Sequence, residues 1–128
     1  MHKSINNLAL INKQIKSKFD DINNLNIIAV SKTFPMSEID PLIKSGHLHF
    51  GENKVQEAVE KWSESKILIK NLKLHMVGKL QTNKVKIAVP LFDYIHSLDS
   101  IKLAKKISLE QKKIKKNLKI FIQVNIGN

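Results

Sequence analysis

Lys32 is the residue of this chain best placed to do covalent chemistry. It follows an apolar run at residues 27–30 and precedes a segment, 33–35, that ends in proline, where the chain must turn. Consecutive apolar residues that are mostly β-branched are typical of a buried strand, predicted here at residues 27–31. Parallel α/β folds, barrels in particular, build their active sites at the carboxyl ends of such strands. Partial burial there favours a neutral amine, which attacks an aldehyde to form an imine.

Polar residues also lie in or just after other predicted strands. If those strands are parallel, their carboxyl ends meet on one rim of the sheet, the rim that carries Lys32. Amide and imidazole groups around a lysine amine could hold a small polar aromatic ligand. The candidates are Asn53, His75, Gln123 and Asn125.

Each candidate also has a simpler structural reading. Asn53 opens a predicted helix and could serve as its N-cap. A histidine inside an apolar strand, such as His75, is more often a hydrogen-bonded core residue than a catalytic base. Gly51 and Gly78, at the ends of two strands, could be ordinary turn glycines. Gln123 and Asn125 alternate with apolar residues, so they share one strand face, which in a barrel could face the lumen.

Short apolar runs alternate along the chain with longer amphipathic stretches. Ser4 is a candidate N-cap for the first helix, Gly46 a candidate C′ glycine, and Pro90 should stop the helix before it. This alternation predicts an α/β fold with parallel strands joined by right-handed helical crossovers. Strands are predicted at residues 27–31, 47–50, 72–77, 92–97 and 119–126. Helices are predicted at residues 5–22, 37–45, 52–65, 81–88 and 100–116.

The composition excludes several classes of protein. The net charge of +11 invites a nucleic-acid reading, but the basic residues are all lysine, and arginine makes the bidentate phosphate and guanine contacts. The chain has no cysteine, no apolar run long enough to span a membrane and no signal-peptide pattern at its start. We therefore expect a cytoplasmic protein without a nucleic-acid or membrane partner. Metal motifs, the nucleophile elbow and glycine-rich phosphate loops are also missing from the sequence.

Five motifs, taken in order, resemble the pyridoxal phosphate homeostasis protein family. They cover roughly residues 25 to 127, and it is the ordered set that makes the resemblance specific. They are Ala29-Val30-Ser31-Lys32-Thr33, Phe50-Gly51-Glu52-Asn53 with Val55-Gln56-Glu57, His75-Met76-Val77-Gly78 with Leu80-Gln81-Thr82-Asn83-Lys84, Ile95-His96-Ser97-Leu98-Asp99, and Ile122-Gln123-Val124-Asn125-Ile126-Gly127.

The resemblance implies a (β/α) TIM-type barrel of pyridoxal phosphate fold type III, similar to the N-terminal domain of alanine racemase. It also implies pyridoxal 5′-phosphate (PLP) held as a Schiff base on Lys32. Members of the family are thought to bind PLP and pass it on to PLP-accepting apoenzymes, which keeps vitamin B6 balanced, and they are not known as efficient enzymes. The racemase's second catalytic domain has no counterpart here, so nothing obvious supplies an opposing acid or base.

The sequence alone also allows two other functions. One is a PLP-dependent racemase or lyase domain that takes its acid or base from a partner. The other is a lysine-rich nucleic-acid-associated protein, whose binding would depend steeply on salt and would ignore Lys32→Ala.

The sequence departs from the family in two respects. Leu74 stands where the family usually has an aromatic residue, and the family's phosphate-binding motif would lie beyond Asn128. Residues 1–128 are therefore expected to be the N-terminal portion of a single PLP-binding barrel domain, truncated after its first five strands. We expect such a chain to bind PLP weakly by itself and to expose a sticky edge at its last strand.

Overall fold

Five parallel strands form one sheet in the computed structural model, which describes residues 2–19 and 25–127. Neighbours in the sheet are neighbours in the chain, in the order β1-β2-β3-β4-β5, and every pairing is parallel. The predicted parallel α/β sheet is therefore confirmed. The strands are β1 Ala29–Val30, β2 His49–Glu52, β3 Lys73–Met76, β4 Tyr94–Leu98 and β5 Lys119–Ile122.

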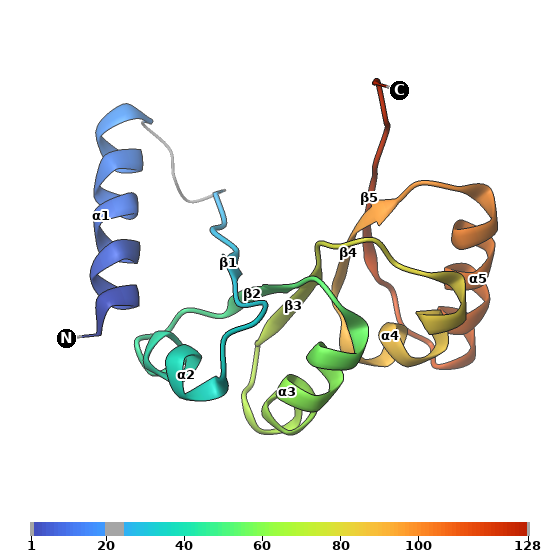
Figure 1. Cartoon of the computed structure of the whole chain (residues 1–128), viewed down its shortest axis with the longest axis horizontal. Coiled ribbons are helices and arrows are strands. Elements are labelled where there is room, and N and C mark those ends of the chain that lie inside the picture. Colours follow the sequence, from blue (N-terminus) through green and yellow to red (C-terminus); the bar gives the residue numbers. More distant parts are fainter. Residues whose placement is uncertain (1, 20–24, 128) are drawn as a thin grey trace.

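The helices that connect successive strands lie together on one side of the sheet, while α1 stands apart next to β1 (Figure 1). A right-handed crossover after every strand places each helix on the same face, which explains this layering. The helices are α1 Lys3–Lys18, α2 Met36–Lys44, α3 Val55–Leu68, α4 Val85–Leu91 and α5 Ile101–Lys113, with a short 3-10 helix η1 at Thr82–Lys84.

The hydrophobic core fills the space between the sheet and these helices. Alternate strand residues point into it: Phe50 on β2, Leu74 on β3 and Ile95 on β4 are each fully buried. Phe50 packs against Trp62 of α3, with the two ring centroids 5.0 Å apart. Because strand side chains alternate between faces, the other residues of each strand point to the opposite face of the sheet. That face is more open; Val30 of β1, for example, is 51% exposed.

Several helix boundaries differ from the sequence prediction; for example, α3 begins at Val55 rather than residue 52 and α5 ends at Lys113 rather than residue 116. Ser4 is not the N-cap of α1; the helix begins at Lys3, and the ring of His2 accepts a hydrogen bond from the Ser4 N–H at 3.1 Å. The helix predicted to end before Pro90 continues to Leu91. Pro90 has no N–H to donate within the last turn, which is closed instead by the Phe92 N–H donating to the Ala88 carbonyl at 3.0 Å. The first helix ends at Lys18, and residues 20–22 of its predicted span lie outside the described residues.

The predicted end of α2 is confirmed in detail. Gly46 follows the C-cap Ser45 with φ +100°. Its N–H donates to the Ile43 carbonyl at 3.0 Å, and the His47 N–H donates to the Leu42 carbonyl at 3.0 Å. These two bonds are those of a Schellman motif, in which the C′ position takes the left-handed conformation that favours glycine.

The two edge strands are shorter than predicted. β1 spans Ala29–Val30, although the Ser31 N–H still donates to the Gly51 carbonyl at 2.9 Å. β5 ends at Ile122, and a last bond joins the Gln123 N–H to the Leu98 carbonyl at 2.7 Å. Beyond Leu98 the neighbouring chain turns into α5, so residues 124–126 have no ladder partner in the part of the chain that the structure describes, and the predicted strand to residue 126 is wrong.

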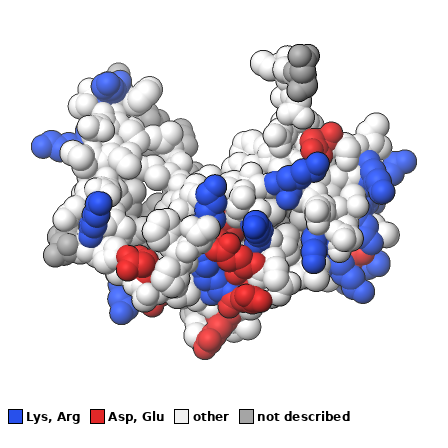
Figure 2. All heavy atoms as spheres, viewed as in Figure 1, with Lys and Arg blue, Asp and Glu red and all other residues white. Residues whose placement is uncertain are grey.

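The surface carries lysines over several elements, while acidic side chains gather near the lower middle of the face shown in Figure 2. Within the described part of the chain, no helix combines the length and apolar character needed to cross a membrane. Nor do these residues bring three or more histidine, aspartate or glutamate side chains together as a metal site would require.

Candidate functional site

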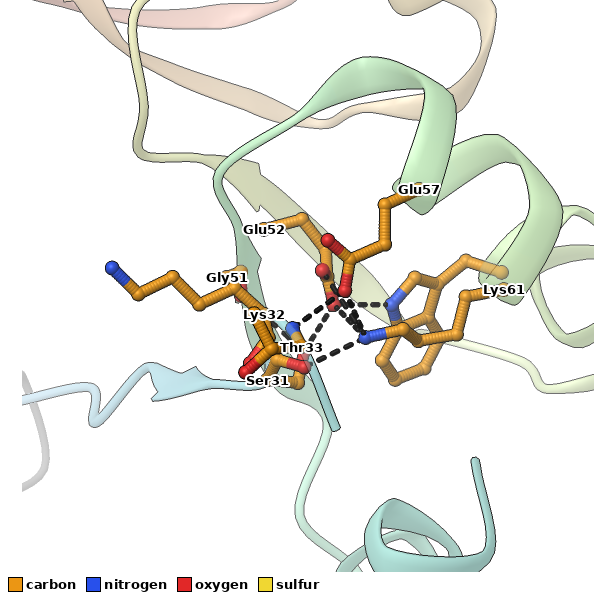
Figure 3. A network of polar contacts seen from close by, with 8 residues as sticks. Ser31, Lys32, Thr33, Gly51, Glu52, Glu57 and Lys61 are labelled. Atoms are coloured by element: carbon orange, nitrogen blue, oxygen red, sulfur yellow. Dashed lines mark hydrogen bonds and ion pairs between the residues drawn. The ribbon is translucent and has the colours of Figure 1, made fainter. Parts of the chain in front are cut away.

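Lys32 lies directly after β1, at the carboxyl end of the sheet's first strand, and its side chain is exposed. The partial burial expected from the sequence is therefore wrong. The reason is strand alternation: Ser31 points into the helix-facing core, so Lys32 points to the opposite, more open face, as Val30 does. Figure 3 shows its side chain extending away from the polar network beneath it.

Glu52 is the centre of that network, and it is fully buried at the end of β2. Its carboxylate accepts hydrogen bonds from the Ser31 hydroxyl at 2.5 Å, the Trp62 indole N–H at 3.0 Å and the Lys61 ammonium at 3.1 Å. A buried carboxylate needs such partners, because an unpaired charge in the interior is strongly destabilising. The three donors join the end of β1 to the middle of α3 (Figure 3).

Lys61 and Glu57 extend the network to the chain around Lys32. The Lys61 ammonium donates to the Ser31 carbonyl at 2.7 Å and pairs with Glu57 at 3.1 Å. Glu57 in turn accepts a hydrogen bond from the Thr33 N–H at 2.5 Å. This N–H, and after it the Lys61 ammonium, lowers the pKa of the Glu57 carboxyl below its usual value. Both chain neighbours of Lys32 are thus held by side chains from β2 and α3.

Asn53 follows β2 on the same rim and lies against the end of β3. A Cβ placed on Gly78 would overlap the side-chain and backbone oxygens of Asn53, so glycine at position 78 is what lets the two segments approach. The alternative in which Asn53 caps α3 is wrong, because Lys54 occupies the N-cap position and no side chain makes a capping bond there. Gly51 is likewise more than a turn residue, since a Cβ there would meet the Ile28 side chain at 3.1 Å.

His75 is buried on the sheet face opposite the helices, at 3% exposure. Its Nε2 lies 2.9 Å from His49 Nδ1 and its Nδ1 lies 2.9 Å from His96 Nε2, while its ring stacks on Tyr94 at 4.1 Å. Burial, and then the neighbouring His96 and His49, lowers the pKa of His75 to about 4. Both ring nitrogens therefore have partners and the ring is neutral at neutral pH, as expected of a hydrogen-bonded core histidine.

The sheet register brings only some of the predicted residues together. Val30 pairs with Gly51, which places Lys32 and Asn53 on the same level of neighbouring strands. Gly51 pairs with His75, so His75 lies two residues, or about 7 Å, below that rim. Gln123 and Asn125 follow β5 at the far edge of the sheet and are exposed. Three strands separate them from β1 in the sheet, and their place in a site with Lys32 stays a prediction.

Several of these residues were not predicted from the sequence. Glu57 and Lys61 are four apart on one helix, a spacing that signals a side-chain pair. The burial of Glu52 had no such signal, because its three donors come from distant parts of the chain. His49 and His96 lie on the strands on either side of β3, each two residues along from the register partner of His75, and only the sheet pairing reveals this.

As a set, the rim residues fit the aldehyde end of a ligand such as PLP. Lys32 offers a solvent-accessible primary amine on a backbone that is fixed from both sides. Asn53 adds an amide on the next strand, where Gly78 leaves room for it. An amine so held can bond to a carbonyl carbon, while the neutral and fully paired His75 lies deeper in the sheet.

Parallel strands in sequential order, with every connecting helix on one side, define part of a (β/α) barrel with a lysine at the end of its first strand. No protein-family model matches the chain. Named proteins do: the pyridoxal phosphate homeostasis protein of Haemophilus influenzae is 38% identical over 95% of this chain and 53% of its own length. That of Escherichia coli K12 is 35% identical over 81% of this chain and 45% of its own length.

Solved structures give the same result. PipY of Synechococcus elongatus PCC7942, solved without PLP, superposes with a TM-score of 0.79 at 36% identity, over 91% of this chain and 53% of PipY. The PLP-bound structure of PipY gives a TM-score of 0.76 over 89% of this chain and 52% of PipY. The predicted barrel class is confirmed. The chain is similar in sequence to the pyridoxal phosphate homeostasis proteins and in fold to PipY, and it spans about half the length of those it matches.

Proposed function

We propose that this chain binds PLP through Lys32 and serves in PLP homeostasis, holding the cofactor rather than transforming a substrate with it. The observation that carries the proposal is the position of Lys32: an exposed amine at the carboxyl end of β1, on a backbone fixed at both neighbours. Relatives named for PLP homeostasis, and a PLP-bound structure of PipY, support it. We also propose that residues 1–128 are the N-terminal portion of a single barrel domain.

PLP supplies an aldehyde carbon, to which the Lys32 nitrogen would bond as the aldehyde oxygen leaves as water, giving a Schiff base. The exposed position of Lys32 leaves its amine accessible to the aldehyde. The net charge of +11 favours the approach of an anionic phosphate ester from a distance, most strongly at low salt. Water would hydrolyse such a bond and return the free amine and the aldehyde, so binding would be reversible, which suits a carrier.

The absence of catalysis, the acceptor apoenzymes and the cytoplasmic location remain predictions, as does the lack of a nucleic-acid partner. The relatives are named for homeostasis and not for a reaction, which supports a carrier. His75 also supports it, because a neutral ring that is paired on both nitrogens is poorly placed to act as an acid or base at Lys32. A racemase or lyase would interconvert or cleave amino acids, and a carrier would not.

The proposal is tested by the absorbance of the purified chain mixed with PLP, measured against PLP alone, because a weakly held imine would be lost if the excess were removed. We expect a visible imine band that borohydride abolishes, with label retained on the protein. Lys32→Ala should lose the band. Lys79→Ala is the matched control, because Lys79 is an exposed lysine after β3, two strands away from β1, and it should keep the band. A band of equal size in Lys32→Ala would contradict the proposal.

A further inference from the structure

We propose that Glu57 and Lys61 of α3 are positioning residues for Lys32: together they form a clamp on the turn that carries it and set the orientation of its amine. The inference rests on the proposed function, since it concerns how the same lysine is presented to an aldehyde. Neither side chain is placed to react. Both act on the backbone of Ser31 and Thr33, the two neighbours of Lys32.

Ser31, the residue before Lys32, is held at its backbone N–H, its carbonyl and its hydroxyl, and the clamp residue Lys61 holds the carbonyl. The Ser31 N–H donates to Gly51, its carbonyl accepts from Lys61 at 2.7 Å, and its hydroxyl donates to the buried Glu52. Every polar group of Ser31 therefore has a partner. Lys61 is itself only 9% exposed and lies between the carboxylates of Glu52 and Glu57, so it is held from two sides.

The residue after Lys32 is held in a conformation that it would not choose alone. Thr33 has φ +67°, in the left-handed region that β-branched residues disfavour. The Phe34 N–H donates to the Ser31 carbonyl at 3.2 Å, which closes a β-turn with Lys32 and Thr33 at its centre. The bond from the Thr33 N–H to Glu57 offsets the unfavourable conformation. A strained turn that side chains from another element stabilise is typical of functional sites.

Fixing this turn matters for imine formation, because the free amine of a flexible lysine must be ordered when the bond forms. A backbone fixed in advance removes part of that entropic cost. The 22 lysines of the chain are chemically alike, so the clamp is what would set Lys32 apart from its exposed peers. Lys79 has no such contacts among the described residues.

The test compares two lysines on the same molecule. Folded protein is incubated with PLP, reduced with borohydride and digested, and the label on Lys32 is divided by the label on Lys79. Glu57→Ala removes the acceptor of the Thr33 N–H and the partner of Lys61, and we expect it to lower the ratio roughly 3- to 10-fold, the effect of losing one such bond. Glu57→Gln keeps an acceptor oxygen but loses the charge, so its labelling ratio should lie between those of the wild type and Glu57→Ala. Glu60→Ala, an exposed acid on the same helix, should match the wild type.

The outcomes separate this inference from the function on which it rests. If wild-type protein labels Lys32 no more than Lys79, the proposed function fails. If wild type favours Lys32 and both Glu57 variants keep its ratio, the clamp has no positioning role and the inference is overturned. Should Glu57→Ala not fold, Glu57→Gln decides, because a ratio equal to wild type overturns the inference and a lower ratio supports it. A change of stability alone would not move a ratio measured within folded molecules.

Discussion

Glu52→Ala should destabilise the chain more than any other single removal of a charge. The side chain is fully buried, and its loss leaves the Lys61 ammonium, 9% exposed, without its buried partner. It also leaves the Trp62 indole N–H and the Ser31 hydroxyl without their acceptor. Breaking a buried ion pair from one side costs about 3–5 kcal/mol. Natural domains have about 0.05–0.15 kcal/mol of stability per residue, so this loss is a large part of the total.

The assay is urea unfolding followed by the fluorescence of Trp62, the one tryptophan of the chain and a buried member of the network. With a typical dependence of about 2 kcal/mol per molar urea, the midpoint should fall by roughly 1.5–2.5 M. Glu60→Ala, on the surface of α3, is the control and should change the free energy of unfolding by less than about 0.5 kcal/mol. A loss below about 1 kcal/mol in Glu52→Ala would refute the reasoning that this carboxylate holds the network together.

A double variant tests whether the cost of Glu52→Ala comes from breaking the ion pair from one side. Glu52→Gln with Lys61→Met removes both charges and keeps an oxygen that can accept from Ser31 and Trp62. Replacing a whole buried ion pair is far less costly than breaking it, so this variant should be more stable than Glu52→Ala. Equal losses in the two variants would contradict the claim that breaking the Glu52–Lys61 pair from one side makes Glu52→Ala costly.

Three further predictions follow from the fold. Gly46→Ala should cost about 1–2 kcal/mol in urea unfolding through its left-handed φ alone, since a Cβ there meets nothing within 4 Å; an unchanged midpoint would contradict this. Gly78→Ala should shift the amide resonances of Asn53, because the Cβ would displace it, and unshifted resonances would argue against the close approach. The lowered pKa of His75 means that the unfolded chain binds a proton before the folded one, so stability should fall as pH drops from 6.5 to about 4. Urea midpoints at several pH values should show a smaller fall in His75→Phe than in wild type, and equal falls would exclude this role.

The sequence predicted the architecture well because each strand is a short apolar run between amphipathic stretches. The signal was weaker at the edges: the apolar run before Lys32 forms only two paired residues, and β5 stops where β4 turns away. Helix ends were predictable where one residue decides them, as at Gly46. Helix ends were not predictable where a nearby side chain takes the capping position instead, as His2 does in place of Ser4.

The candidate site was predicted only in part. The motif around Lys32 and the adjacent Asn53 could be read from strand ends, because parallel strands bring their carboxyl ends to one rim. Gln123 and Asn125 could not be placed, since their distance from Lys32 depends on the sheet order. Glu52 became a buried acid only through contacts with Ser31, Trp62 and Lys61, which long-range packing brings together and local sequence does not.

The most direct test of the central claim is a map of where PLP bonds to the chain. The folded protein is reduced with borohydride in the presence of PLP, digested, and the label on each of its 22 lysines is quantified by mass spectrometry. We predict that Lys32 carries more label than any other lysine, and that unfolding in urea before the reaction abolishes its preference. Label spread evenly over the exposed lysines of the folded chain would contradict the claim that the fold presents Lys32 as the PLP-binding residue.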